Sequence, residues 1–303
     1  MITFYNSQTQ SFLDGMQQIQ QREAQAQQEL TTGLRINTVS DAPDQISNLL
    51  SLRSAIARNT QIGENLASVK SETDAAESAV SNAVSLVEHA QSLGAQGASD
   101  VTTNSATTRQ QLAQQVGDVL TELVSIANTT VGGRYIFAGD SDQTQPYAID
   151  LTQANPISAY AGSASTRQVE APNGSAFAIA QTAQQLFDAP GGNNSVFSSI
   201  NNLRNALLNN DSAGIQTALA QVGGADQYLN NELAFYGNVQ DQVTNATNDQ
   251  ATCDTQLRTQ LSTLEDADET QAITDLTQAQ TQQQAALASE AQLPRTSLFN
   301  FLG

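Results

Sequence analysis

The chain has 303 residues, 39% of them hydrophobic, and a formal net charge of −19 at pH 7. Because Lys70 is the only lysine and the arginines are scattered singly, no basic stripe could neutralise nucleic-acid phosphates or anionic lipids. No stretch reaches the roughly 20 apolar residues that a membrane-spanning helix needs. We therefore expect neither nucleic acid nor a membrane as partner. The absence of Trp favours long, thin helical packing.

The N-terminal part predicts a sparsely apolar helix between about residues 8 and 33. Its apolar side chains follow a 4-3 spacing in a segment rich in Gln and Ala: Phe12, Met16, Ile19, Ala26 and Leu30. Gly33 ends this helix, and the turn formers up to Pro43 predict a structured connection in which Ser40 or Asp41 caps the next helix. Residues 1–8 lack a basic and an apolar leader region, so we expect no cleavable signal peptide.

The middle of the chain predicts long helices around a short β-rich insertion. Residues 44–96 are expected to form a second helix. Its seam residues alternate at three- and four-residue steps, as in a coiled coil: Leu66, Val69, Thr73, Ala76, Val80, Ala83, Val87 and Ala90. A third helix with the same repeat is expected to stop near Gly132. From about residue 134 to 182 the period changes to short runs separated by Gly, Pro, Asn and Asp, which predicts strands. A short helix from Val196 and a very long one from Ser212 follow.

The C-terminal part predicts a joint and a second thin seam. The hydrophobic register fails across residues 265–269, and we expect this acidic run to be a solvated helix joint, because it lacks the spacing and the central Gly of a calcium loop. The apolar positions beyond it are Ile273, Leu276 and Leu287, followed by the tail residues Leu298, Phe299, Phe301 and Leu302.

Together these patterns predict a mainly α fold, with elongated antiparallel coiled-coil helices from both chain ends and a small β-rich inserted domain. The expected domains are a terminal helical assembly domain (1–43 with 265–303), a helical bundle (44–132 with 192–264) and an outer β-rich domain (133–191). Ordering each residue in a helix costs about 1 to 2 kcal/mol of backbone entropy, which one thin seam cannot offset. Either the two ends pack on each other within the chain, or they order against neighbouring copies. In both cases they are assembly elements.

A catalytic, metal or cofactor site has few residues to draw on. His89 is the only histidine, so any metal cluster or catalytic pair of the usual kinds would have to use it, and we expect a solvated helix residue instead. Cys253 lies on a helical stripe beside a leucine seam and is expected to be a packing residue. We therefore expect neither an enzyme nor a cofactor.

Two segments resemble the bacterial flagellin family. The run from Leu30 to Pro43 is similar to the N-terminal signature of that family, and residues 264–268 with 297–302 are similar to its C-terminal counterpart. The resemblance implies a spoke between the innermost helices and the next domain, and its residues in this sequence are Gly33, Arg35, Asn37, Asp41 and Pro43. It also implies export through the flagellar type III route, and an extracellular place in the flagellum.

Shorter motifs resemble the members of this family that join the flagellar hook to the filament. These motifs are Val131 to Gly139, Tyr160 to Gly162 and residues 167–170. They imply a structural subunit that self-associates in a ring or helical layer. The implied partners are the hook-side junction protein, filament flagellin, and an export chaperone at the C-terminal segment.

Two alternatives stay open at this stage. The first is filament flagellin itself, a different position in the same machine. The second is a secreted coiled-coil effector or adhesin, because such proteins use similar periodicity.

Overall fold

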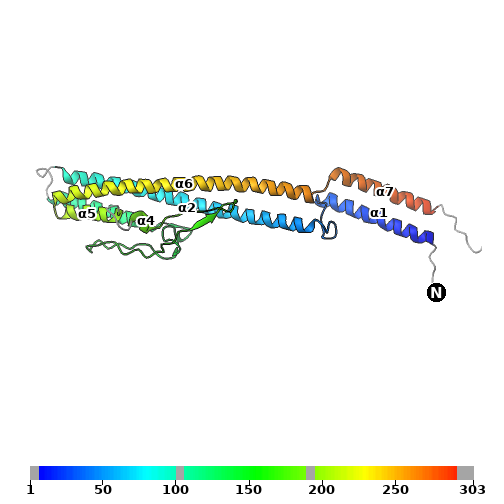
Figure 1. The fold of residues 1–303 in the computed structure, drawn as a ribbon, viewed down its shortest axis with the longest axis horizontal. Helices are drawn as coiled ribbons and strands as arrows, with labels where there is room; N and C mark the ends of the chain where they lie inside the picture. Colours follow the sequence, from blue (N-terminus) through cyan, green and yellow to red (C-terminus); the bar gives the residue numbers. More distant parts are fainter. Residues whose placement is uncertain (1–6, 100–105, 189–194, 292–303) are drawn as a thin grey trace, which may run out of the picture. The chain divides into compact units, whose positions relative to one another are not determined.

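The computed structural model describes residues 7–99, 106–188 and 195–291, which are mainly helical (Figure 1). The helices are α1 (Ser7–Thr32), α2 (Ile46–Ala98), α3 (Ala106–Ala127), α4 (Ala183–Phe187), α5 (Val196–Leu208), α6 (Ser212–Glu265) and α7 (Glu269–Ala291). The strands are β1 (Thr130–Val131), β2 (Arg134–Tyr135), β3 (Gln168–Glu170) and β4 (Ala176–Ala178). The predicted fold class, mainly α with a small β-containing segment inside, is confirmed.

The described residues form two compact units. One contains the residues up to Arg58 together with those from Asp254 onward, and the other is Asn59–Cys253. α2 and α6 each run through both units. The three-domain division expected from the sequence stays a prediction.

The larger unit has a core built by coiled-coil spacing. All eight predicted seam positions of α2, from Leu66 to Ala90, are buried. They pack with buried residues of α3, α5 and α6. Because many seam residues are alanine or glycine, the helices approach closely: a Cβ added to Gly94 would lie 2.7 Å from Cδ2 of Leu219 on α6. Sequence periodicity therefore located this core correctly.

The β-containing segment consists of two small antiparallel hairpins. β1 and β2 pair with Val131 opposite Arg134, and Gly132 and Gly133 form the turn with φ of 59° and 78°. Such positive φ angles at both central residues favour glycine. The third helix therefore ends at Ala127, before the expected Gly132, because the glycines turn a hairpin and do not end the helix. β3 and β4 pair with Val169 opposite Phe177.

Ion pairs fasten this segment to α2. The carboxylate of Glu72, whose side chain is only 9% exposed, accepts a hydrogen bond at 3.0 Å from Nη2 of Arg134 on β2. Arg167, one residue before β3, pairs with the other carboxylate oxygen. Two guanidinium groups thus satisfy one buried carboxylate, which a buried charge requires.

Candidate assembly site

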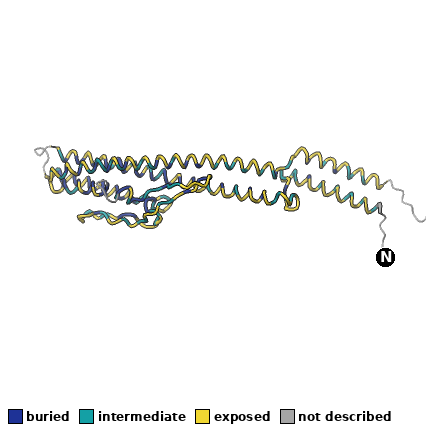
Figure 2. The backbone as a smooth tube through the Cα atoms, viewed as in Figure 1, coloured by how far each residue is buried: buried dark blue, intermediate teal, exposed yellow. Residues whose placement is uncertain are grey.

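The two chain ends form one antiparallel helix pair in the smaller unit, because α1 and α7 pack along each other (Figure 1). On α7 the inward positions follow a heptad spacing, with Ala272 and Ala279 buried and Leu276 half-buried. Among residues 9–32 of α1, whose burial is described, Ala26 alone is buried. The predicted residues of α1 are all half-buried: Phe12, Met16, Ile19 and Leu30. Figure 2 shows the resulting mixture of exposed and half-buried residues along both helices.

The remaining predicted residues of α7 lie on a different stripe. Ile273 and Leu287 are each 55% exposed, and they are two heptads apart on the same helical face. The sequence analysis placed them in one seam with Leu276, but the structure separates them, because alanines occupy the inward positions. Leu13 on α1 is also exposed, at 51%. The predicted tail residues Leu298, Phe299, Phe301 and Leu302 lie outside the described residues.

Local capping explains where the two helices end and begin. Gly33 has φ of 71°, and its N–H donates to the carbonyl of Glu29 at 2.8 Å, as in a left-handed C-cap. Asp268 precedes α7, and its Oδ1 accepts a hydrogen bond from the backbone N–H of Gln271 at 3.1 Å. Glu269 places a negative charge in the first turn, where the helix dipole favours it.

Two of the predicted spoke residues, Gly33 and Arg35, form a cross-link between the chain ends. The backbone N–H of Arg35 donates to the carbonyl of Glu265 at 2.7 Å, and its Nη2 donates to the carbonyl of Leu264, also at 2.7 Å. The N–H of Ala267 in turn donates to the carbonyl of Gly33 at 2.9 Å. These bonds tie the end of α1 to the end of α6. The spoke role expected for this segment stays a prediction.

Asp41 organises the loop before α2. Its carboxylate accepts hydrogen bonds from the backbone N–H groups of Thr38 at 2.6 Å and Asn37 at 2.9 Å, and from the Thr38 hydroxyl. These bonds lower the pKa of Asp41, with the Thr38 backbone bond as the largest cause. The expected role of Asp41 as the cap of the next helix was wrong: α2 begins at Ile46, and Asp41 closes a turn with the residues before it. Pro43 is exposed.

Glu265 is a residue whose role the sequence analysis missed. It was expected to lie in a solvated joint, but it is only 4% exposed and forms an ion pair with Arg53 of α2. The other acidic residues of the joint, Asp266, Asp268 and Glu269, are exposed as expected. The partner is 212 residues away in sequence, so periodicity alone could not indicate this pair.

The residues considered for other chemistry belong to the larger unit. His89 is exposed on α2, and Cys253 is half-buried on α6 with a free thiol. Within the described ranges, no helix combines the length and hydropathy that would let it cross a membrane.

The fold and this site define a class of protein: a helical subunit that contains a pair formed by its two chain ends and, as a second unit, a long-helix bundle with small β hairpins. Comparison with protein families makes this specific. Residues 4–142 match the bacterial flagellin N-terminal helical region, and residues 217–302 match the bacterial flagellin C-terminal helical region. The two matches together cover most of the chain. The chain therefore belongs to the bacterial flagellin family.

Similar proteins carry names from one part of the flagellum. The chain is 27% identical over 163 residues to flagellar hook-associated protein 3 of Escherichia coli, which covers 54% of this chain and 49% of that protein. It thus spans about half the length of this curated relative.

Solved structures share the fold over a larger part of the chain. A putative flagellar hook-associated protein from Vibrio parahaemolyticus has a TM-score of 0.65 at 16% identity, covering 74% of this chain and 99% of that one. Hook-associated protein 3 from Legionella pneumophila has a TM-score of 0.62 at 16% identity, covering 71% and 98%. FlgL from Xanthomonas campestris has a TM-score of 0.60 at 18% identity, covering 70% and 99%.

Proposed function

We propose that this chain is a structural subunit of the flagellum that forms the junction between hook and filament, assembling through its terminal helices. The observation that carries the proposal is the α1 and α7 pair, which leaves Leu13, Ile273 and Leu287 exposed. The similar proteins are named as flagellar hook-associated proteins, which supports a position next to the hook. The work of such a subunit is mechanical, with no catalysis and no cofactor.

The exposed stripe suits contact with another copy of the chain. Fully burying a Leu or Ile side chain contributes about 1.5 to 3 kcal/mol. Since Ile273 and Leu287 are each 55% exposed, covering both in a neighbouring copy would contribute roughly 2 kcal/mol per subunit. In a ring or helical layer this contribution repeats at every contact, and the predicted half-buried residues of α1 would gain further cover.

The proposed partners follow from the proposed position. Copies of the chain would form one layer, the hook-side junction protein would lie on one side of it, and filament flagellin on the other. An export chaperone would hold the C-terminal segment before assembly. The proposed place of action is outside the cell, in the flagellum, after export by the flagellar type III route.

A double variant tests the assembly surface directly. Ile273→Ser with Leu287→Ser should leave the helix content and unfolding free energy of the monomer nearly unchanged, because both residues are exposed. The same variant should fail to restore filament attachment in a strain that lacks the gene. Thr274→Ser with Ala288→Ser, at neighbouring exposed positions of α7, is the matched control and should restore it. Normal attachment with the first variant would refute the proposed surface.

Two further experiments separate the junction role from the alternatives. Deleting residues 270–303 should leave a folded middle that does not assemble between hook and filament. Purified full-length chain in high salt should not form long filaments, whereas filament flagellin would polymerise under these conditions. A secreted effector or adhesin would not be needed for filament attachment at all, so a motile deletion strain would overturn the flagellar role.

A further inference from the structure

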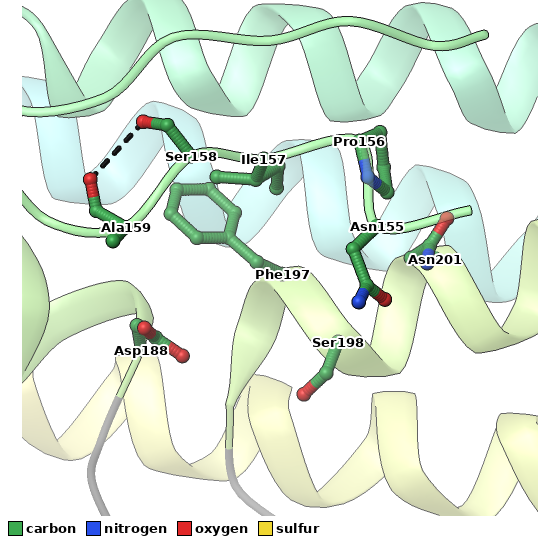
Figure 3. Close-up of a pocket in the computed structure, with 9 residues that line it drawn as sticks. All are labelled: Asn155, Pro156, Ile157, Ser158, Ala159, Asp188, Phe197, Ser198 and Asn201. Atoms are coloured by element: carbon green, nitrogen blue, oxygen red, sulfur yellow. Dashed lines mark hydrogen bonds between the residues drawn. The ribbon is translucent and has the colours of Figure 1, made fainter. Parts of the chain in front are cut away.

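A groove of about 310 Å³ lies between the extended segment 155–159 and the first turns of α5. Figure 3 shows this segment crossing α5, with Ile157 beside the ring of Phe197 and with Asp188 and Asn201 toward opposite ends. The ring of Phe197 is fixed from below, since it stacks on Phe187 with ring centroids 5.3 Å apart. The groove therefore has a rigid apolar floor and polar ends.

The segment above this floor has one paired edge and one free edge. The N–H of Asp150 donates to the carbonyl of Pro156 at 2.7 Å, and the N–H of Ser158 donates to the carbonyl of Ala148 at 2.9 Å. Ile157 and Ile149 are opposite each other in this antiparallel bridge and form a non-hydrogen-bonded pair. The N–H and C=O of Ile157 therefore point away from Ile149, toward the free edge. Within the described part of the chain, neither of these groups has a hydrogen-bond partner.

A buried acceptor at one end of the groove also lacks a partner. Asn201 is only 8% exposed, and its Nδ2 donates to the carbonyl of Ala154 at 3.3 Å. Its Oδ1 is buried without a hydrogen bond from any described residue. At the other end, the carboxylate of Asp188 accepts one bond from the Ser195 hydroxyl at 3.2 Å. Asp188 and Asn201 thus both line the groove, and a buried acceptor without a donor is unfavourable.

We propose that this groove binds an extended segment of a partner protein by β-strand addition, with an arginine or lysine of that segment reaching Asp188 or Asn201. The free N–H and C=O of Ile157 supply the main-chain bonds, which is how extended peptides join sheet edges. Phe197 supplies the apolar contact. The cationic side chain matches the two acceptors, since Arg and Lys carry donors and no acceptor.

The geometry limits the length of the bound segment. Pro156 directs its carbonyl toward Asp150 on the paired edge, and the chain bends at Asn155, so the added strand pairs with residues 157–159. Three residues of extended chain span about 10 Å. So few main-chain bonds give little affinity alone, and the side-chain contacts are needed. This inference concerns the β-containing segment and does not depend on the junction role.

A displayed library of hexapeptides with a fixed central Arg or Lys, panned on the full-length chain, tests the proposal. The strongest binder is then synthesised with a fluorescent label, and its affinity is measured by anisotropy. Ile157→Pro removes the free N–H without breaking a ladder bond and should weaken binding at least about tenfold. Asn201→Leu, which removes the unpaired acceptor, should weaken it similarly.

The charge contact has its own control. Asp188→Asn should weaken binding of the peptide with the central Arg or Lys about tenfold. It should leave unchanged the binding of a peptide in which uncharged norleucine replaces that residue. Asp150→Asn changes an exposed carboxylate of the same hairpin outside the groove and should leave binding unchanged. Thermal unfolding shows which variants are folded. If Asn201→Leu does not fold, Ile157→Pro and Asp188→Asn are enough to test the proposal. An empty selection, or a binder insensitive to both Ile157→Pro and Asp188→Asn, would overturn the proposal.

Discussion

The cost of breaking the Glu72 ion pairs should depend strongly on which partner is removed. The Glu72 side chain is 9% exposed, whereas those of Arg134 and Arg167 are 45% and 31% exposed. Glu72→Gln leaves two guanidinium groups that can turn to water, so we expect a loss of about 1 kcal/mol of unfolding free energy. Replacing both arginines by Met keeps their apolar stems but leaves a buried carboxylate alone, which costs about 3 to 5 kcal/mol.

Urea unfolding of the full chain, followed by amide exchange in α2 and β3, measures these losses. Adding Glu72→Gln to the variant with both arginines replaced should restore roughly 2 kcal/mol, because the unpaired charge is then gone. Lys70→Met, which breaks the exposed pair with Asp74 two residues along the same helix, is the control and should cost less than about 0.5 kcal/mol. If Glu72→Gln cost as much as replacing both arginines, the reasoning from burial would be refuted.

Three further changes test the two turns that flank the loop before α2 and one contact between α2 and α6. Gly33→Ala should cost about 1 kcal/mol in thermal unfolding from its φ of 71° alone, since no atom lies within 4 Å of an added Cβ; an unchanged stability would contradict the C-cap. Because the pKa of Asp41 is lowered in the folded chain, its contribution to stability is present above the unfolded pKa and is lost as pH falls through the folded pKa. Acid should therefore speed exchange of the Thr38 amide more in the unchanged chain than in Asp41→Asn. The same pH profile in both proteins would count against this turn. The side chains of Asn59 and Gln250 donate to each other's backbone carbonyls at 3.1 and 3.2 Å. Asn59→Leu should therefore cost about 1 to 3 kcal/mol of unfolding free energy, because a buried group loses its partner. Replacing both residues by Leu should cost less, which a double-mutant cycle would measure.

The sequence predicted the helices well because their signals are local. Heptad spacing located the buried face of α2, and the capping glycine and the acidic joint located the ends of α1 and α6 within a few residues. Heptad spacing follows from the 3.6 residues per turn of a single helix, so it can be recognised without knowing which helix packs against it. The same local signals predicted strands between about residues 134 and 182, the range in which β2, β3 and β4 lie.

The misses involve residues that act across long sequence separations. Glu72 is 62 residues from Arg134 and 95 from Arg167, and neither spacing has a periodic signature. Glu265 was read as part of a solvated run because its neighbours are acidic, but one helical turn decides which of them faces Arg53. Ile273 and Leu287 were predicted to share one seam with Leu276, but alanines occupy the inward positions of α7 and leave these two residues on a separate exposed stripe. Their burial between copies stays a prediction.

The use of alanine inside the terminal pair explains why this part of the chain suits assembly. Among the residues of α1 and α7 whose burial is described, Ala26, Ala272 and Ala279 alone are buried. Each buries little apolar surface compared with a Leu or Ile. The larger apolar residues are half-buried or exposed, so a pair of helices this long keeps much of its apolar surface in contact with water. Because helix order is costly and the inner seam is thin, the pair gains most when neighbouring copies cover that surface. The packing that makes the isolated pair weak is thus the packing that leaves its apolar residues available for assembly.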